Sequence, residues 1–600
     1  MSQAYAKEMV RPEVVEPGFE RSKMFAILRR FWAELTVVVL AMMLWAPRLS
    51  GPIDLRWDGG VYYLLGTSLA QGHGYRITSE PGTPEALQYP PLLPAFVALH
   101  EKLLNSYDPA RVGPWLRKSY AALFVLYGLA AFAVAKVYLQ PKWALAAAAM
   151  ALLHHHVVFL SDLLYAELPF ALIVLLFVLV TTRQRTSPRP RARELLLFIL
   201  AAAAFLLRTA GLALFAAWIV DAIILRHWRL VLVRTALAVI PVVGWQSYVA
   251  RVQASNEYAH PAYAYQRAAY QFSNVSYREN MSLRDPFRPE AGYANAGVLL
   301  RRVARNAATL PIALGEAVSA KADAWPLKRF EHNRPRQPSL ISVEKRGKFA
   351  DVTPDPGRGG IILAPIFVLS ALMAGGMVLL VTRHAWITLG IMVGLVALIC
   401  LTPWPLQLTR YLTPLAPFFA ICFFLGWTKA YSWPAFIRNK QLAIIARVVL
   451  VCVLIATFAV EVYADGKLFY GRAKSSALCK AIGAGEGNAF FAHEESWQAW
   501  EKATNWIDKH AEHHAIIATS QPHLSYLLTG RRAVLPPMEM DPARERELLR
   551  SVPVHYVIID QLLALDVTRH YVLPAIGNSE GWRLVYENSG AAIYAPNAQR

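Results

Sequence analysis

The run Phe31-Trp-Ala-Glu-Leu-Thr-Val-Val-Val-Leu-Ala-Met-Met-Leu-Trp-Ala-Pro47 decides the broad fold class. It holds one charged residue, Glu34, and approaches the length of about 20 residues that an α-helix needs to cross a bilayer. A secretory signal peptide would have a shorter apolar core and a small-residue cleavage site. We therefore predict an uncleaved first membrane span that follows a cytoplasmic N-terminal segment, residues 1–30.

Ten further apolar runs follow, and we predict a membrane span in each of them because apolar residues surround these helices on all faces. With the N-terminus in the cytoplasm, eleven spans place the C-terminus on the outer side of the membrane. The further spans are expected near residues 117–138, 143–161, 164–182, 195–208, 210–225, 230–250, 360–382, 385–402, 411–428 and 442–463.

The composition agrees with a multi-pass membrane protein. Apolar residues make up 56% of the 600 residues and charged residues 17%, against about 45–50% and about 25% in soluble domains. These values exclude a disordered chain, a secreted disulfide scaffold and an ordinary cytosolic enzyme.

The net charge of +20 is expected from basic cytoplasmic loops and from attraction to anionic membrane lipids. No basic helix or aromatic-basic module predicts a nucleic-acid partner, and the four cysteines predict neither a disulfide framework nor a metal site.

Loop charge gives an independent test of the predicted topology. The loop Arg183–Arg193 carries five arginines, and it falls on the predicted inner side. The basic loops at 226–229, 383–384 and 429–440 fall on the same side. The stretch 195–225 is long for one span and short for two. Because Arg208-Thr-Ala-Gly211 interrupts it as a polar turn would, we predict two spans there.

Three large segments remain on the outer side: the first outer loop (49–116), the second outer loop (251–358) and a tail (464–600). The tail is predicted to be a small α/β domain. Helices are expected at 495–513 and 522–529, with strands at 515–518, 554–559, 582–586 and 591–594. The predicted fold class is therefore a polytopic α-helical membrane protein, with about 11 transmembrane helices in residues 31–463 and a small extracytoplasmic α/β domain.

The first outer loop holds the most informative motifs. It contains Asp54-Leu-Arg-Trp-Asp58-Gly-Gly-Val-Tyr62-Tyr63, then Gln71-Gly-His73-Gly-Tyr75-Arg76, then Gln88-Tyr89-Pro-Pro-Leu92. Residues 62–70 have the apolar spacing of a helix that lies along the membrane surface. Such a helix would hold Asp58 at the bilayer boundary, where a lipid-linked substrate presents its head group.

These motifs resemble the GT-C superfamily of membrane glycosyltransferases. Protein O-mannosyltransferases, lipid A aminoarabinose transferases and lipopolysaccharide-core galacturonosyltransferases are the most similar groups. The resemblance rests on Asp58 with Tyr four and five positions later, on a Gly-x-Gly-Tyr and a Tyr-Pro-Pro-Leu in the same loop, and on Glu167 opening the fourth span. It continues with Arg410-Tyr411-Leu-Thr-Pro-Leu-Ala-Pro417 and covers roughly residues 30–430.

The resemblance implies a donor sugar on a polyprenyl phosphate and a lipid, glycan or protein acceptor in the cell envelope. Asp58 would be the general base in a one-step displacement that inverts the anomeric centre. Arg or Lys would stabilise the phosphate leaving group. The chemistry demands no metal and no cofactor, and the implied location is a bacterial inner membrane, with the C-terminal domain outside.

The sequence departs from the family pattern at two places. Many relatives have Asp-Glu where this chain has Asp58-Gly59, so another carboxylate, for example Asp54, would have to replace the missing one. The aminoarabinose transferases have Glu-Lys where this chain has Gln88-Tyr89. The positive charge for a lipid phosphate would then come from Arg76, Arg208 or the second outer loop.

Each candidate also has a structural interpretation. Asp58 could be a helix cap, and Glu167 or the competing Asp162 could form an ion pair instead of binding the acceptor. Arg208 and Arg410 could mark the membrane boundary instead of gripping phosphate. The other candidate substrate-binding residues are Asp54, Tyr62, Tyr63, His73, Arg76, Tyr89 and Tyr411. His154-His-His156 is not expected to bind a metal, because consecutive helical positions point about 100° apart.

Two other functions compete with glycosyl transfer. A flippase or transporter of lipid-linked sugars would explain the helices and the basic residues, but it favours charges in mid-span and internal repeats. A structural membrane protein whose tail binds an envelope partner would leave Asp58 dispensable. The gathering of acidic residues at the predicted outer boundary favours an interfacial active site.

Overall fold

The computed structural model describes residues 17–183, 190–319, 356–404, 407–433, 439–481, 495–562, 566–577 and 579–597. Most of the loop with five arginines, residues 184–189, and the later part of the second outer loop, residues 320–355, lie outside these ranges.

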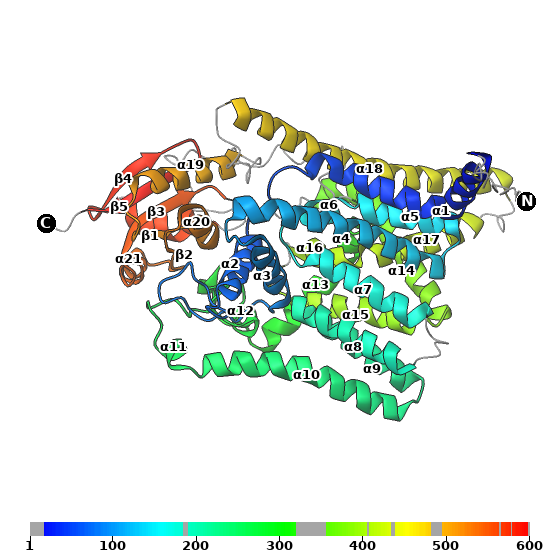
Figure 1. Cartoon of the computed structure of the whole chain (residues 1–600), viewed down its shortest axis with the longest axis horizontal. Helices are drawn as coiled ribbons and strands as arrows, with labels where there is room; N and C mark the ends of the chain where they lie inside the picture. Colours follow the sequence, from blue (N-terminus) through cyan, green and yellow to red (C-terminus); the bar gives the residue numbers. More distant parts are fainter. Residues whose placement is uncertain are drawn as a thin grey trace, which may run out of the picture.

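All eleven predicted spans are helical in the structure. Figure 1 shows these helices side by side, with the tail at one end of the molecule and the outer loops between the helices and the tail. The helices are α1 (Pro17–Trp45), α4 (Pro109–Tyr138), α5 (Pro141–Leu153) with α6 (His155–Ser161), α7 (Glu167–Arg183), α8 (Pro190–Leu207), α9 (Leu212–Ile224), α10 (Trp228–Gln253), α14 (Pro356–Thr382), α15 (Trp386–Cys400), α16 (Leu408–Leu412) with η8 (Thr413–Leu415) and α17 (Ala416–Ser432), and α18 (Lys440–Ala481).

Six helices of the described residues are long and apolar enough to cross a membrane, and a seventh is added if the bent pair α5–α6 is one span. Three more of the eleven, within α7, η2 (Thr209–Gly211) with α9, and α15, are apolar but shorter. The remaining one, α8, begins with the charged residues Arg191, Arg193 and Glu194. The protein is therefore a helical multi-pass membrane protein.

The helix breaks follow from local sequence. The predicted polar turn at 208–211 is confirmed, because α8 ends at Leu207 and η2 separates it from α9. The α5–α6 pair bends by 53° where His154 leaves the helical conformation and caps α6 by accepting a hydrogen bond from the Val157 amide.

Helices α14 and α17 cross at unusually close range. A Cβ atom on Gly376 would lie 1.8 Å from the carbonyl oxygen of Cys422, and one on Gly426 would lie 1.9 Å from that of Leu372. Any side chain at these two positions would therefore force the backbones apart. Small residues allow such close backbone packing between membrane helices, where the hydrophobic effect contributes little.

The outer loops contain short helices. These are η1 (Ala46–Arg48), α2 (Asp58–Ala70) and α3 (Leu92–Leu104) before α4, and α11 (Asn256–Ala259), α12 (Tyr277–Ser282), η3 (Pro289–Ala291) and α13 (Ala296–Glu316) after α10. The helix that we expected at 62–70 begins earlier, at Asp58, and most of its residues are buried. It packs against α3 and the tail helix α20 (Pro522–Thr529), so it lies inside the outer layer rather than open on the membrane surface.

The tail contains a small mixed sheet, as the predicted α/β domain requires. The strand order is β2-β1-β3-β5-β4, with β1 parallel to β2 and β3, and β5 antiparallel to β3 and β4. Ile517 pairs with Ala533 and Ile558 with Ile593, and all four side chains are buried. The elements are α19 (Glu495–His510), β1 (Ile516–Ala518), α20, β2 (Ala533–Val534), α21 (Pro542–Arg550), β3 (Val554–Asp560), η11 (Thr568–Val572), α22 (Leu573–Ile576), β4 (Trp582–Glu587) and β5 (Ala591–Pro596).

The tail is joined to both outer loops by hydrogen bonds. The amide of Ala533 in β2 donates to the carbonyl of Ser79, 2.8 Å away. The ring of His523 in α20 bonds the hydroxyls of Ser79 (2.9 Å) and Ser273 (3.1 Å). Burial lowers the pKa of His523 to about 4, so the ring is neutral and both nitrogens serve these hydroxyls. The tail therefore has a fixed position above α2.

Candidate active site

A short backbone bridge sets the start of α2. The Asp54 amide donates to the Asp162 carbonyl (3.1 Å), and the Leu164 amide donates to the Asp54 carbonyl (2.9 Å). A Cβ atom on Gly59 would lie 3.1 Å from that same Asp54 carbonyl. This close contact leaves little room for a side chain at the position after Asp58.

Trp57, which precedes Asp58, has a strained backbone with φ 53° and ψ −122°. Such a conformation costs of order 1–3 kcal/mol in a residue other than glycine and persists only where the surroundings impose it. The Trp57 ring packs edge-on against Phe159 (6.2 Å) and against Trp497 of α19 (5.5 Å). The Arg56 guanidinium lies over both tryptophan rings. Packing by the tail therefore helps to hold the residue that presents Asp58.

Four charged side chains from four distant segments meet beside the start of α2. Arg410 of α16 donates to Asp58 Oδ2 (2.6 Å) and to Glu167 Oε1 (2.8 Å). Arg208, between α8 and η2, bonds the same Glu167 oxygen at 2.5 Å. The result is a chain of ion pairs in the order Asp58, Arg410, Glu167, Arg208, which we call the charge network.

Access to solvent differs along the charge network. The side chain of Glu167 is 1% exposed, whereas those of Asp58, Arg410 and Arg208 are 27%, 21% and 21% exposed. A buried carboxylate needs compensating charge, and the two arginines supply it. Glu167 therefore anchors the two arginines, while the side chains of Asp58, Arg208 and Arg410 each keep about a fifth to a quarter of their surface exposed.

Tyrosines surround the charge network. The Tyr89 hydroxyl donates to Asp58 Oδ1 (3.1 Å), and the Tyr62 and Tyr89 rings lie 4.9 Å apart. Burial and the nearby Asp58 charge raise the pKa of both tyrosines, which keeps the Tyr89 hydroxyl protonated as a donor. The Arg410 guanidinium lies 4.3 Å from the Tyr165 ring centre, and Arg208 lies 5.5 Å from that of Tyr411. Cation–π contacts of this kind restrict both arginines.

The structure thus brings together seven of the twelve residues singled out from sequence, and it places the other five elsewhere. Asp54 forms a buried ion pair with Arg56 (2.8 Å), and Asp162 forms one with Arg117 (2.9 Å). The Tyr63 hydroxyl donates to the Tyr107 carbonyl. The remaining two, His73 and Arg76, follow the far end of α2. The seven that meet are Asp58, Tyr62, Tyr89, Glu167, Arg208, Arg410 and Tyr411.

Sequence reasoning missed Trp57, Tyr165 and Trp497. Tyr165 stands two positions before Glu167, and this spacing could have indicated it. The strain at Trp57 and its contact with Trp497 have no sequence signal, because they join segments 440 positions apart. Among the described residues, no group of three or more His, Cys, Asp or Glu side chains is arranged to hold a metal ion.

Two solved structures match almost the whole chain. ArnT from Cupriavidus metallidurans bound to undecaprenyl phosphate aligns with a TM-score of 0.50 and 10% identity, over 94% of this chain and 98% of that one. The archaeal oligosaccharyltransferase AglB from Archaeoglobus fulgidus, in complex with an inhibitory peptide and a dolichol-phosphate, aligns with a TM-score of 0.51 and 12% identity, over 95% of this chain and 75% of that one. No family model matches the sequence, and no curated protein does. The fold predicted from the motifs is confirmed by these alignments: the chain has the fold of the GT-C membrane glycosyltransferases.

Proposed function

We propose that this protein is a membrane glycosyltransferase that moves one sugar from a polyprenyl phosphate to an acceptor hydroxyl of an envelope lipid, glycan or protein. The observation that carries the proposal is the charge network, in which a partly exposed carboxylate and two partly exposed arginine side chains stand together on a GT-C-like fold. The solved structure of ArnT holds undecaprenyl phosphate, and that of AglB holds dolichol-phosphate. A polyprenyl-phosphate donor is therefore the natural choice for this site.

The proposed reaction is a single displacement. The acceptor oxygen attacks the anomeric carbon of the donor and forms the new glycosidic bond, while the bond between that carbon and the phosphate oxygen breaks. The acceptor proton passes to Asp58, and the bonding electron pair leaves with the polyprenyl phosphate. Attack opposite the leaving group inverts the anomeric configuration. General base catalysis of this kind contributes about 10²–10⁴-fold to a rate.

At the exposed side of the charge network, Arg410 can bond either Asp58 or the phosphate of a donor. The Arg410 guanidinium bonds both Asp58 and Glu167. A donor phosphate that binds at the exposed sides of Arg208 and Arg410 competes with Asp58 for the Arg410 guanidinium, since arginine favours bidentate contacts with phosphate. The same event then neutralises the leaving group and frees Asp58 to accept a proton.

The proposed topology has eleven spans, with residues 1–30 in the cytoplasm, a transmembrane domain at 31–463 and an extracytoplasmic domain at 464–600. Asp58, Glu167, Arg208 and Arg410 then all lie at the outer ends of spans or directly after them. This arrangement suits a donor that has already been carried to the outer leaflet of the plasma membrane.

Mass spectrometry of envelope glycans from a deletion strain tests the proposal. The strain is complemented with wild type, with Asp58→Asn, or with Asp108→Asn. Asp108 is an exposed aspartate of the same outer loop, and it caps α4, a role that Asn also fills. We expect wild type and Asp108→Asn to restore a species that is one sugar heavier, and Asp58→Asn to restore none at equal protein levels.

The same experiment separates catalysis from transport. A transporter without chemistry does not need Asp58 as a base, so equal restoration by Asp58→Asn would reject the proposed reaction. The mass difference in the wild-type strain identifies the class of the transferred sugar.

A further inference from the structure

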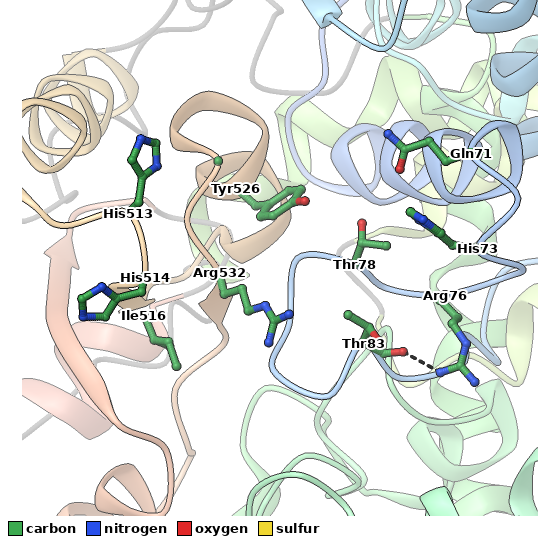
Figure 2. Close-up of a pocket in the computed structure, with 11 residues that line it drawn as sticks. Gln71, His73, Arg76, Thr78, Thr83, His513, His514, Ile516, Tyr526 and Arg532 are labelled. Atoms are coloured by element: carbon green, nitrogen blue, oxygen red, sulfur yellow. Dashed lines mark hydrogen bonds between the residues drawn. The ribbon is translucent and has the colours of Figure 1, made fainter.

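A cavity of about 660 Å³ lies between the first outer loop and the tail (Figure 2). This volume is within the range of about 300–1,000 Å³ that is typical of ligand pockets. The loop contributes Gln71, His73 and Arg76, and the tail contributes His513, Tyr526 and Arg532. Hydrogen-bond donors therefore face the cavity from both sides, and no carboxylate is among the side chains that line it.

The walls of the cavity are held in place by the contacts that join the tail to the loop. Ser79, which bonds Ala533 and His523 of the tail, stands next to the lining residue Thr78 in the loop. In the tail, Ala533 directly follows the lining residue Arg532. On the loop side, His73 stands between two glycines with φ of 78° and 83°, a backbone that other residues rarely adopt. The contacts of Ser79 with the tail therefore hold the two walls at a fixed separation, which lowers the entropic cost of binding between them.

The cavity is remote from the charge network. Asp58 begins α2, and the lining residue Gln71 follows its last residue. A helix of 13 residues is about 20 Å long at about 1.5 Å per residue. A donor whose anomeric carbon must reach Asp58 cannot place the same sugar in the cavity. An acceptor built of several sugars can occupy both places.

The charge of the cavity selects among such acceptors. Figure 2 shows Arg532 extending from the tail toward the loop segment that carries Thr78 and Thr83. Arg532 is exposed, and no carboxylate pairs with it in the described part of the chain. On the opposite wall, Arg76 Nη1 bonds both Glu257 (2.9 Å) and the Thr83 carbonyl (2.8 Å). The Arg76 and Glu257 side chains are each about one-third exposed, so a ligand anion can compete with Glu257 for Arg76. The two guanidinium groups suit the oxygens of a carboxylate or a phosphate.

We propose that this cavity is a remote subsite for an anionic saccharide, one that bears a carboxylate or a phosphate, within an extended acceptor. The inference rests on the proposed function, since it supplies the reason for an acceptor to cross from the cavity to Asp58. Binding at the remote subsite orients the acceptor, and its reacting hydroxyl lies several sugars away, beside Asp58.

Fluorescence anisotropy with the full chain in detergent tests the remote subsite. The probes are dye-labelled trigalacturonate, maltotriose that carries one phosphate, and unmodified maltotriose. We expect an anionic probe to bind wild type and Asp58→Asn equally, with a dissociation constant at least tenfold weaker for Arg532→Ala. The matched control is Arg583→Ala, which removes the same charge from an exposed position on β4 of the tail and should bind within twofold of wild type.

The comparison between the two anionic probes tells which anion the remote subsite prefers, and tighter binding of either one supports the proposal. Equal binding of neutral maltotriose, unchanged binding by Arg532→Ala, or no binding of either anion to wild type would overturn it. The binding assay tests the remote subsite, and the transfer assay with Asp58→Asn tests the proposed reaction. A rejected subsite would therefore leave a loss of transfer in Asp58→Asn unaffected.

Discussion

Replacing Glu167 with Gln tests the centre of the charge network. Arg208 and Arg410 each place a nitrogen against the same Glu167 oxygen, at 2.5 and 2.8 Å. The two cationic nitrogens are therefore within about 5 Å of each other, where their repulsion is about 3 kcal/mol at an effective dielectric constant of about 20. Glutamine keeps the shape of the side chain but removes the negative charge that offsets this repulsion.

We expect two measurable effects from Glu167→Gln. The thermal midpoint of the detergent-solubilised protein, followed by tryptophan fluorescence, should fall by roughly 2 °C, since about 3 kcal/mol is spread over the unfolding entropy of a chain of this length. Transfer per folded molecule should fall about 100-fold, because a displacement of about 1 Å in a positioning group costs that much. Envelope mass spectrometry at matched protein levels measures the second effect.

A matched variant separates stability from catalysis. Glu194 also pairs with a buried arginine, Arg234, at 2.9 Å, but it lies at the opposite end of the helices from Asp58. Glu194→Gln should lower the thermal midpoint and leave transfer per folded molecule within twofold of wild type. If Glu167→Gln kept its midpoint within 1 °C and its transfer within threefold, the charge network would not hold the site together.

Three further perturbations follow from the structure. Gly376→Ala should lower the yield of monodisperse protein in size-exclusion chromatography, whereas Gly375→Ala, whose Cβ meets nothing within 4 Å, should not; equal yields would reject the close crossing of α14 and α17. Burial raises the pKa of Glu545 to about 9, above its unfolded value of about 4.3, so its contribution to stability is complete below about pH 4 and is lost as the pH rises toward 9. The thermal midpoint of Glu545→Gln, measured by fluorimetry, should therefore rise relative to that of wild type as the pH increases from 5 to 9. A difference between the two midpoints that stays constant with pH would contradict this. Trp497→Ala should lower transfer more than tenfold while Trp497→Phe largely restores it, because an aromatic ring must hold the strained Trp57; unchanged transfer in the alanine variant would show that the tail does not support the site.

The members of the charge network could be predicted because each stands at a helix end that the hydropathy pattern marks. Asp58, Glu167, Arg208 and Arg410 all follow or open an apolar run on one predicted side of the membrane. Their grouping therefore follows from topology and motif order alone. The sequence could not predict which carboxylate pairs with which arginine, because Asp162 and Glu167 stand close together in sequence. In the structure, Asp162 forms its ion pair with Arg117, outside the charge network.

His73 and Arg76 are near Asp58 in sequence but not in space. Both belong to the loop that carries Asp58, but the straight helix α2 separates them from it and places them at the remote subsite. In the tail, Gly530 marked the end of α20, and its φ of 67° fits the left-handed cap. The two-residue strand β2 and the highly charged helix α21 were missed, since neither has the apolar periodicity from which elements are predicted.

The most direct test of the central claim is the rate of sugar transfer from a purified polyprenyl-phosphate donor, carrying the sugar that the envelope mass difference identifies, to the native acceptor. Wild type and Asp58→Asn are compared in proteoliposomes, with donor binding measured on the same samples. We predict that the rate for Asp58→Asn falls by about 10²–10⁴-fold while donor binding changes less than threefold, and that the wild-type product has the anomeric configuration opposite to that of the donor. A rate within tenfold of wild type, or a product with retained configuration, would contradict the role of Asp58 as the general base.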